Sequence, residues 1–193
     1  MRESSTMRLV TITQEFVEIF HFPTEIMSKD HDGRNRPFLL LLTLLYKGKE
    51  RMFALPFRSN IQVNKNTRGT YFALPRRHTT KTGHAHGLHY TKIFPIMKGY
   101  YDRYHIPDTE YDHMVKGYIQ RNIKTIINEA QQYLIAYENG VRYRYCTDID
   151  RMIEALDAYE AAKQMIKKTA EQIAIGNESE SRDGENIYED DII

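Results

Sequence analysis

The longest apolar run of this chain spans residues 38–46, which is the length of a β-strand and too short for a membrane-spanning helix. A turn of Lys47, Gly48 and Lys49 follows it, and residues 52–56 form a second apolar run. Two such runs joined by a short glycine-containing turn predict a β-hairpin. Because its first strand is almost continuously apolar, we expect that strand to be buried on both faces of a sheet.

The remaining strands are predicted to be short and the later helices long. Alternation and turn residues predict strands at residues 7–13, 71–74 and 90–96, a short helix or turn at 14–27, and a basic loop at 76–87. Apolar residues at intervals of three and four predict one helix from Asp108 or Thr109 to Asn139, and a second from Asp148 to Gly176, each with a core face. Strands followed by helices predict an α+β fold with two long C-terminal helices.

The length of the chain suits one domain with its own core. We expect residues 1–6 to be a flexible leader, with Met1 or Met7 as the natural start, and residues 7–176 to form a single domain. Residues 177–193 hold seven acids against one base, which predicts a disordered acidic tail. Without a secretory signal or a membrane-spanning run, we predict a cytoplasmic protein that binds no membrane.

The formal net charge of +1 conceals a segregation of charge along the chain. The predicted tail carries −6, which leaves +7 for residues 1–176. Between Arg58 and His105 lie nine bases, five of the eight histidines and a single acid, Asp102. Such a local excess attracts polyanions, although a solvated basic face without a ligand would have the same composition.

Several other chemistries are disfavoured by the residues present. His84, His86 and His89 offer three imidazoles, but no acid lies near them in the sequence and the surrounding bases oppose a dication. We therefore predict no metal and no cofactor. A phosphate-binding glycine loop and a nucleophile elbow are both missing, and Cys146, the single cysteine, is more readily explained as a small residue than as a nucleophile.

Cations interleaved with aromatic residues favour single-stranded RNA, and not DNA, as the ligand, because cations contact phosphates while aromatic rings stack on unpaired bases. Some of the tyrosines are expected to belong to the core instead. The same residue types also permit cleavage without metal, in which the 2′-hydroxyl attacks the adjacent phosphorus and leaves a 2′,3′-cyclic phosphate. The predicted RNA contacts are Lys65, Arg68, Arg76, Arg77, Lys81, Lys92 and Tyr90.

Two blocks of the sequence resemble the toxins of type III toxin–antitoxin systems, the ToxN/AbiQ group. The first, residues 36–61, is similar to the group's strand, turn and return strand, which lead into a Pro–apolar–Thr/Ser–Ser motif, here residues 56–59 (PFRS). The Arg-Ser form of this motif is most similar to the TenpN branch. The second block, residues 87–96, resembles the group's later Gly-Leu–strand–Pro-Ile segment. The resemblance covers about residues 7–140.

This resemblance implies a metal-independent endoribonuclease on a compact, strongly bent antiparallel sheet with a barrel-like core, wrapped by helices. It also implies an antitoxin RNA that the toxin cuts from a repeat array and then holds in a protein–RNA hetero-oligomer. Such a system would limit growth or abort phage infection by cleaving cellular or phage RNA. The alternative is a non-catalytic RNA-binding module that uses the same basic and aromatic surface.

The resemblance assigns Ser59, by its place in the motif, to a hydrogen bond with the scissile phosphate. We predict that Arg58 clamps the phosphate, with Arg36 or Lys65 as the second cation. Because histidine titrates near neutral pH, His86 or His89 is the predicted group for proton transfer.

The sequence departs from the pattern of the group in two respects. Asn60 and Ile61 follow the serine where a lysine is usual, and Phe16 stands where a tyrosine is usual. These departures favour the non-catalytic alternative.

Overall fold

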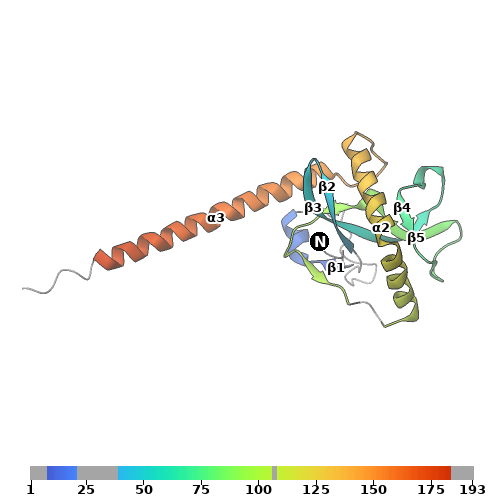
Figure 1. The fold of residues 1–193 in the computed structure, drawn as a ribbon, viewed down its shortest axis with the longest axis horizontal. Coiled ribbons are helices and arrows are strands. Elements are labelled where there is room, and N and C mark those ends of the chain that lie inside the picture. The colour runs from blue at the N-terminus through green and yellow to red at the C-terminus, as the bar shows by residue number, and fades with distance from the viewer. Residues whose placement is uncertain (1–7, 21–38, 106–107, 184–193) are drawn as a thin grey trace, which may run out of the picture. The chain divides into compact units, whose positions relative to one another are not determined.

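The computed structural model describes residues 8–20, 39–105 and 108–183, and the chain divides into two compact units, Met1–Ile153 and Glu154–Ile193 (Figure 1). The strands, all in the first unit, are β1 (Arg8–Ile12), β2 (Leu39–Tyr46), β3 (Lys49–Gln62), β4 (Tyr71–Ala73), β5 (His84–His89), β6 (Phe94–Pro95) and β7 (Tyr101–Arg103). The helices are α1 (Gln14–Phe20), α2 (Glu110–Glu138) and α3 (Ile149–Asp183), with short 3-10 helices η1 (Lys65–Thr67) and η2 (Tyr90–Lys92). The predicted α+β class and the two long C-terminal helices are confirmed.

The seven strands form one antiparallel sheet in the order β4-β5-β3-β2-β1-β7, with β6 paired to β3. The two end strands, β4 and β7, have three residues each and do not pair with each other. The sheet is therefore open, so the term barrel-like, implied by the resemblance, describes its core only loosely.

The predicted hairpin is confirmed as β2 and β3, which pair from Leu39↔Pro56 to Tyr46↔Lys49. Its two turn residues, Lys47 and Gly48, both have positive φ (47° and 74°), which matches the twist of the flanking strands. The prediction that the first strand is buried on both faces is wrong, because Leu45 is 50% exposed while α2 packs on the opposite face.

One strand lies where the sequence predicted a loop. β5 covers residues 84–89, whereas residues 90–96 form η2 and the two-residue β6 instead of the predicted strand. Gly87 of β5 lies so near β4 that a Cβ on it would be 2.5 Å from the backbone oxygen of Phe72. Histidines occupy three of the strand's six positions, so its alternation is not one of apolar with polar residues.

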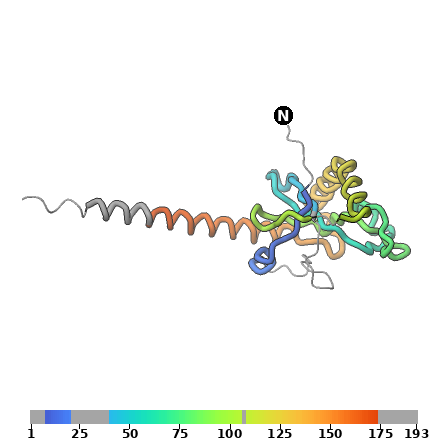
Figure 2. Tube along the Cα trace, turned by 90° about the horizontal axis from the view of Figure 1, so that it is seen from below, coloured from blue at the N-terminus to red at the C-terminus, as the bar shows by residue number. Residues whose placement is uncertain are grey.

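The sheet supports a buried layer on each face. On one face α2 covers the main core, which includes Leu40, Leu42, Phe53, Leu55 and Leu88. On the other face α1 contributes Phe16 and Phe20 to an aromatic cluster with Phe94 and Tyr100, whose ring centroids lie 4.9 to 6.4 Å apart. Figures 1 and 2 show α1 and α2 on opposite sides of the strands. Phe16 is thus a core residue.

Both long helices begin where the sequence predicted. Thr109 caps α2 by accepting a hydrogen bond from the Asp112 backbone N–H at 3.1 Å, and Gly140, with φ of 86°, follows its end. Asp148 Oδ1 accepts a hydrogen bond from the Arg151 backbone N–H in the first turn of α3. Side-chain capping therefore sets both starts, as expected from the residue types.

The far end of α3 differs from the prediction. The helix passes Gly176 and continues to Asp183, since one glycine inside a helix costs only about 1 kcal/mol. Met165, Ile166 and Ile173, predicted to face the core, are 60 to 71% exposed. The predicted leader and residues 184–193 of the predicted tail lie outside the described residues, and the single domain over residues 7–176 stays a prediction.

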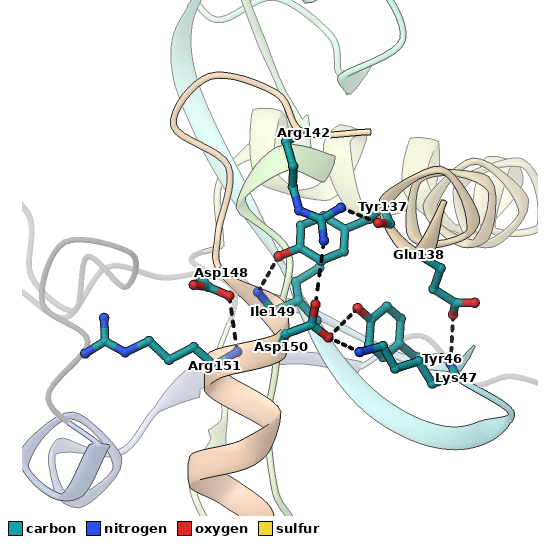
Figure 3. Close-up of polar contacts among 9 residues, drawn as sticks. All are labelled: Tyr46, Lys47, Tyr137, Glu138, Arg142, Asp148, Ile149, Asp150 and Arg151. Carbon is teal, nitrogen blue, oxygen red and sulfur yellow. Dashed lines mark hydrogen bonds and ion pairs between the residues drawn. The ribbon is translucent and has the colours of Figure 1, made fainter. Parts of the chain in front are cut away.

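Asp150 joins three elements of the first unit at the hairpin turn (Figure 3). Its Oδ1 accepts hydrogen bonds from Tyr46 Oη at 2.9 Å and Lys47 Nζ at 2.6 Å, and its Oδ2 lies 3.6 Å from Arg142. Partial burial alone would raise the pKa of Asp150, but the bonds from Lys47 and Tyr46 and the nearby positive charges hold that pKa below its ordinary value. The hairpin turn, the end of α2 and the start of α3 are tied together here.

Replacing Asp150 by asparagine is expected to lower the free energy of unfolding at pH 7 by about 1–2 kcal/mol, because the charge-assisted bonds are lost. The native pKa lies below the unfolded one, so this stabilisation is present above the ordinary aspartate pKa and disappears as the pH falls through the lowered one. Urea unfolding of both proteins between pH 7 and pH 3 tests this. A constant difference across that range would contradict it, and Glu160→Gln, on an exposed part of α3, is the control.

Candidate functional site

The predicted pair Arg58 and Ser59 lies at an irregularity in β3. The register between β3 and β5 shifts between Arg58 and Ile61, so that Ser59 and Asn60 together lie opposite one residue, His86. A β-bulge of this kind bends its strand and redirects side chains, and bulges are frequent beside active sites. Ser59 is exposed at this bulge.

Asn60 explains how the irregularity is tolerated. Its φ is 57°, a left-handed conformation that asparagine adopts more readily than most residues. Its Oδ1 accepts a hydrogen bond of 3.1 Å from the backbone N–H of Lys81, which fixes the loop before β5 to the bulge. The residue after the serine therefore has a structural role, and the buried Ile61 that follows it brings no cation to the site.

Arg58 and His89 lie on the same face of the sheet. Arg58 pairs with Gly87, and strand alternation returns the side chain of His89 to that face. Burial, followed by the positive charges of Arg58 and Lys92, lowers the pKa of His89 from 6.5 to about 4. The imidazole is therefore neutral at pH 7 and able to accept a proton.

The two ring nitrogens of His89 have different surroundings. Nε2 lies 3.2 Å from the hydroxyl oxygen of Thr91, which orients the ring. Nδ1 is buried and has no hydrogen-bond partner among the described residues. A buried nitrogen without a partner is costly, and a bound ligand or a small side-chain movement would satisfy it.

His86, the alternative for proton transfer, is on the opposite face. Its ring lies 6.4 Å from the rings of Phe57 and Tyr111, in a pocket that Arg77 and the first turns of α2 also line. Burial, followed by the charge of Arg77, lowers its pKa below the ordinary value. The two histidines are therefore not interchangeable, because the sheet separates them and His89 alone of the two shares a face with Arg58.

The predicted RNA contacts fall into separate groups. Arg77 stacks over the ring of Tyr111 at 5.1 Å and lies 4.0 Å from Asp112, whereas Arg76 donates hydrogen bonds to two carbonyls of its own loop. Lys92 is half-buried beside His89. Arg76 and Arg77 are exposed despite these contacts, as are Lys65, Arg68 and Lys81 in the segments that flank β4.

Tyr90 is 1% exposed and donates a 2.6 Å hydrogen bond to Glu129 of α2, so its ring belongs to the core and cannot stack on a base. Burial and that bond raise its pKa. Arg36 lies outside the described residues.

Sequence reasoning missed Thr91, which orients His89, and Gly87, which lets β4 and β5 approach. Nothing in the sequence marks the Thr91 contact, because it depends on the turn that η2 makes. The interrupted alternation at Arg58, Ser59 and Asn60 is the one signal that predicts a bulge.

Within residues 8–20, 39–105 and 108–183, no three histidine, cysteine or acidic side chains gather as metal ligands. The helices of these same residues include none with the length and apolar character needed to cross a membrane.

Comparison with known proteins shows the fold of the chain. Searches of protein-family models and of curated proteins gave no match. Among solved structures, one from a bacterial antiviral system regulated by a processed non-coding RNA is 16% identical, with a TM-score of 0.57 over 77% of this chain and 96% of that chain. Another, from a study of bacterial type III toxin–antitoxin systems with selective toxin inhibition by a non-coding RNA pseudoknot, is 14% identical, with a TM-score of 0.56 over 80% and 98%.

At this identity the likeness shows a shared fold. The fold implied by the sequence resemblance to type III toxins is thereby confirmed, and the TenpN branch is not distinguished from the rest of the group.

Proposed function

We propose that this protein is a type III toxin that cleaves RNA without a metal and is neutralised by its own antitoxin RNA. The observation that carries the proposal is the pairing of β3 with β5, in which Arg58 shares a face with the neutral His89 and Ser59 is exposed at the adjoining bulge. The shared fold supports it, since it extends over nearly the whole length of two bacterial proteins whose regulation or inhibition by non-coding RNA is described.

The proposed reaction is transesterification within the RNA strand. Neutral His89 takes the proton of the 2′-hydroxyl, the 2′-oxygen bonds to phosphorus, and the bond from phosphorus to the 5′-oxygen breaks. Water supplies the proton to that leaving oxygen, and the products are a 2′,3′-cyclic phosphate and a 5′-hydroxyl. Arg58 and Lys92 stabilise the charge on the phosphoryl oxygens, Ser59 donates a hydrogen bond to them, and Arg36 or Lys65 supplies a further cation.

The partners follow from the same proposal. A small structured antitoxin RNA would occupy the Arg58–His89 face in a protein–RNA hetero-oligomer, and cellular or phage RNA would be cut when the toxin is released. The exposed cations Lys65, Arg68 and Lys81 would contact phosphates on either side of the scissile bond.

A second function is favoured by two specific observations. Phe16 is fully buried without a hydroxyl, and Ile61 is buried where the similar toxins have a lysine. A protein with these substitutions can bind RNA through the same cations and leave it intact. The alternative is therefore a non-catalytic RNA-binding module.

Cleavage of a labelled RNA with EDTA present distinguishes the two. We expect 2′,3′-cyclic phosphate ends from the wild type, loss of cleavage of about 100-fold or more in His89→Ala, and a smaller loss in Ser59→Ala, which removes one phosphate hydrogen bond. His86→Ala, on the other face, is the matched control and should retain cleavage. Intact RNA that still binds the wild type would support the non-catalytic module, and unchanged cleavage in both Ser59→Ala and His89→Ala would refute the assignment.

A further inference from the structure

The segment between α2 and α3, residues 139–148, holds a tyrosine in an unusual state. Tyr145 is 71% exposed and has φ of 61°. A bulky side chain in the left-handed region is rare, and such strain costs on the order of 1–3 kcal/mol and tends to mark functional positions. A ring this exposed buries little apolar surface, so it does not offset the free-energy cost of the strained backbone.

A tight turn holds this conformation. The Cys146 backbone N–H donates a 3.1 Å hydrogen bond to the Tyr143 carbonyl, which closes a four-residue turn with Tyr145 in its third position. Turns with positive φ at that position usually have glycine or asparagine there. On the inner side, Tyr143 stacks on Tyr133 with centroids 6.0 Å apart, and Thr147 is fully buried. The turn is thus anchored on both sides and presents its tip, Arg144 and Tyr145, outward.

The tip has the composition of an RNA-binding surface. Arg144 Cζ lies 4.8 Å from the centroid of the Tyr145 ring, so a guanidinium and a phenol ring are already stacked. Arg142 and Arg144 are the charged residues between Glu138 and Asp148, which makes the segment purely basic. Both planar groups can stack on an unpaired base while the arginine contacts phosphate.

The turn is joined to the candidate site. The Thr147 backbone N–H donates a 2.9 Å hydrogen bond to the Thr91 carbonyl, and the Thr91 hydroxyl contacts His89 Nε2. One residue of η2 therefore connects the basic turn to the histidine assigned to proton transfer. All RNA contacts predicted from the sequence lie within residues 36–105, so this second segment is not among them.

We infer that Arg144 and Tyr145 form a nucleobase-stacking site for single-stranded RNA, outside the basic stretch of residues 58–105. The site rests on the proposed function, because it holds a strand that also lies on the Arg58–His89 face. Tyr145 stacks on one unpaired base, and Arg144 contacts a neighbouring phosphate. The positive φ aims the ring at the base before binding, which reduces the ordering cost of association.

Binding of a fluorescent single-stranded 2′-fluoro RNA, which lacks the attacking hydroxyl, tests the site in the full-length protein. Tyr145→Ala should weaken binding at least about fivefold, as expected for loss of one stacked base, while Tyr145→Phe should stay within about twofold of the wild type. Arg144→Ala should weaken binding and lower the slope of log affinity against log salt by about one. Lys124→Ala, an exposed cation on α2, is the control for loss of one charge.

The outcomes separate this inference from the proposed function. If the wild type binds RNA and Tyr145→Ala binds equally well, the stacking site is overturned while the proposed function stands. If Tyr145→Phe binds as weakly as Tyr145→Ala, the hydroxyl and not the ring is responsible, and stacking is likewise overturned. A wild type that binds no RNA overturns both.

A stability measurement excludes a structural role for the ring. Tyr145→Gly relieves the positive φ, so we expect its melting temperature to equal or exceed that of Tyr145→Ala while its RNA binding stays weak. If Tyr145→Gly and Tyr145→Ala both melt several degrees below the wild type, the ring supports the fold, and the inference is overturned.

Discussion

Arg58→Ala is expected to lower RNA cleavage by about 100-fold or more, because one fixed donor to a phosphoryl oxygen is typically worth two to three orders of magnitude in rate. Arg58 lies on β3 at the bulge, on the face shared with His89. Arg58→Lys should recover part of the activity, since lysine keeps the charge but not the planar fork. Single-turnover cleavage of a labelled RNA measures both variants.

A second measurement on the same variant tests the geometry directly. Burial is the largest cause that lowers the pKa of His89 to about 4, and the positive charge of Arg58 is the second largest. In Arg58→Ala that pKa should therefore rise toward 6.5, and an NMR titration of the histidine ring would detect the change. An unchanged pKa of His89 would contradict the shared face, and the pKa of His86, which responds to Arg77 instead, provides the internal control.

Gly87→Ala is expected to lower the free energy of unfolding by about 1–3 kcal/mol, an effect of the size that overpacked positions show. A Cβ at this position would be 2.5 Å from the Phe72 carbonyl oxygen and 3.0 Å from the Tyr71 side chain. Because the nearer contact is backbone, β4 must move away from β5 to relieve it. Urea unfolding gives the loss of stability directly.

Gly117→Ala is the matched control for that substitution. Its Cβ would meet the flexible end of the Arg121 side chain at 3.3 Å, which can move. Removing a glycine from the interior of α2 should stabilise the protein by about 0.5–1 kcal/mol. Both substitutions replace glycine by alanine, but they are expected to change the free energy of unfolding in opposite directions. Equal destabilisation by both would therefore refute the close approach of β4 and β5.

The sequence predicted elements whose signals are local. The β2–β3 hairpin follows from two apolar runs and a turn at Lys47 and Gly48, and the starts of α2 and α3 follow from Thr109 and Asp148, whose side chains cap them. β5 was missed because three histidines obscure its alternation and because its pairing with β3 and β4 is not marked by a short turn in the sequence. The end of α3 was misplaced because a single glycine does not stop a helix.

For the candidate site, too, the sequence predicted the residue types but not their arrangement. The sequence by itself determined the types of group available: an arginine and a serine after a strand, two histidines nearby, and an excess of cations without acids. Only the tertiary structure decided which of them meet. Strand alternation places His89 with Arg58 and sends His86 to the opposite face, the shift at Ser59 and Asn60 exposes the serine beside Arg58, and burial removes Tyr90 from the surface. The reason is that side-chain direction and burial depend on register and packing between segments far apart in the chain, which local residue patterns do not encode.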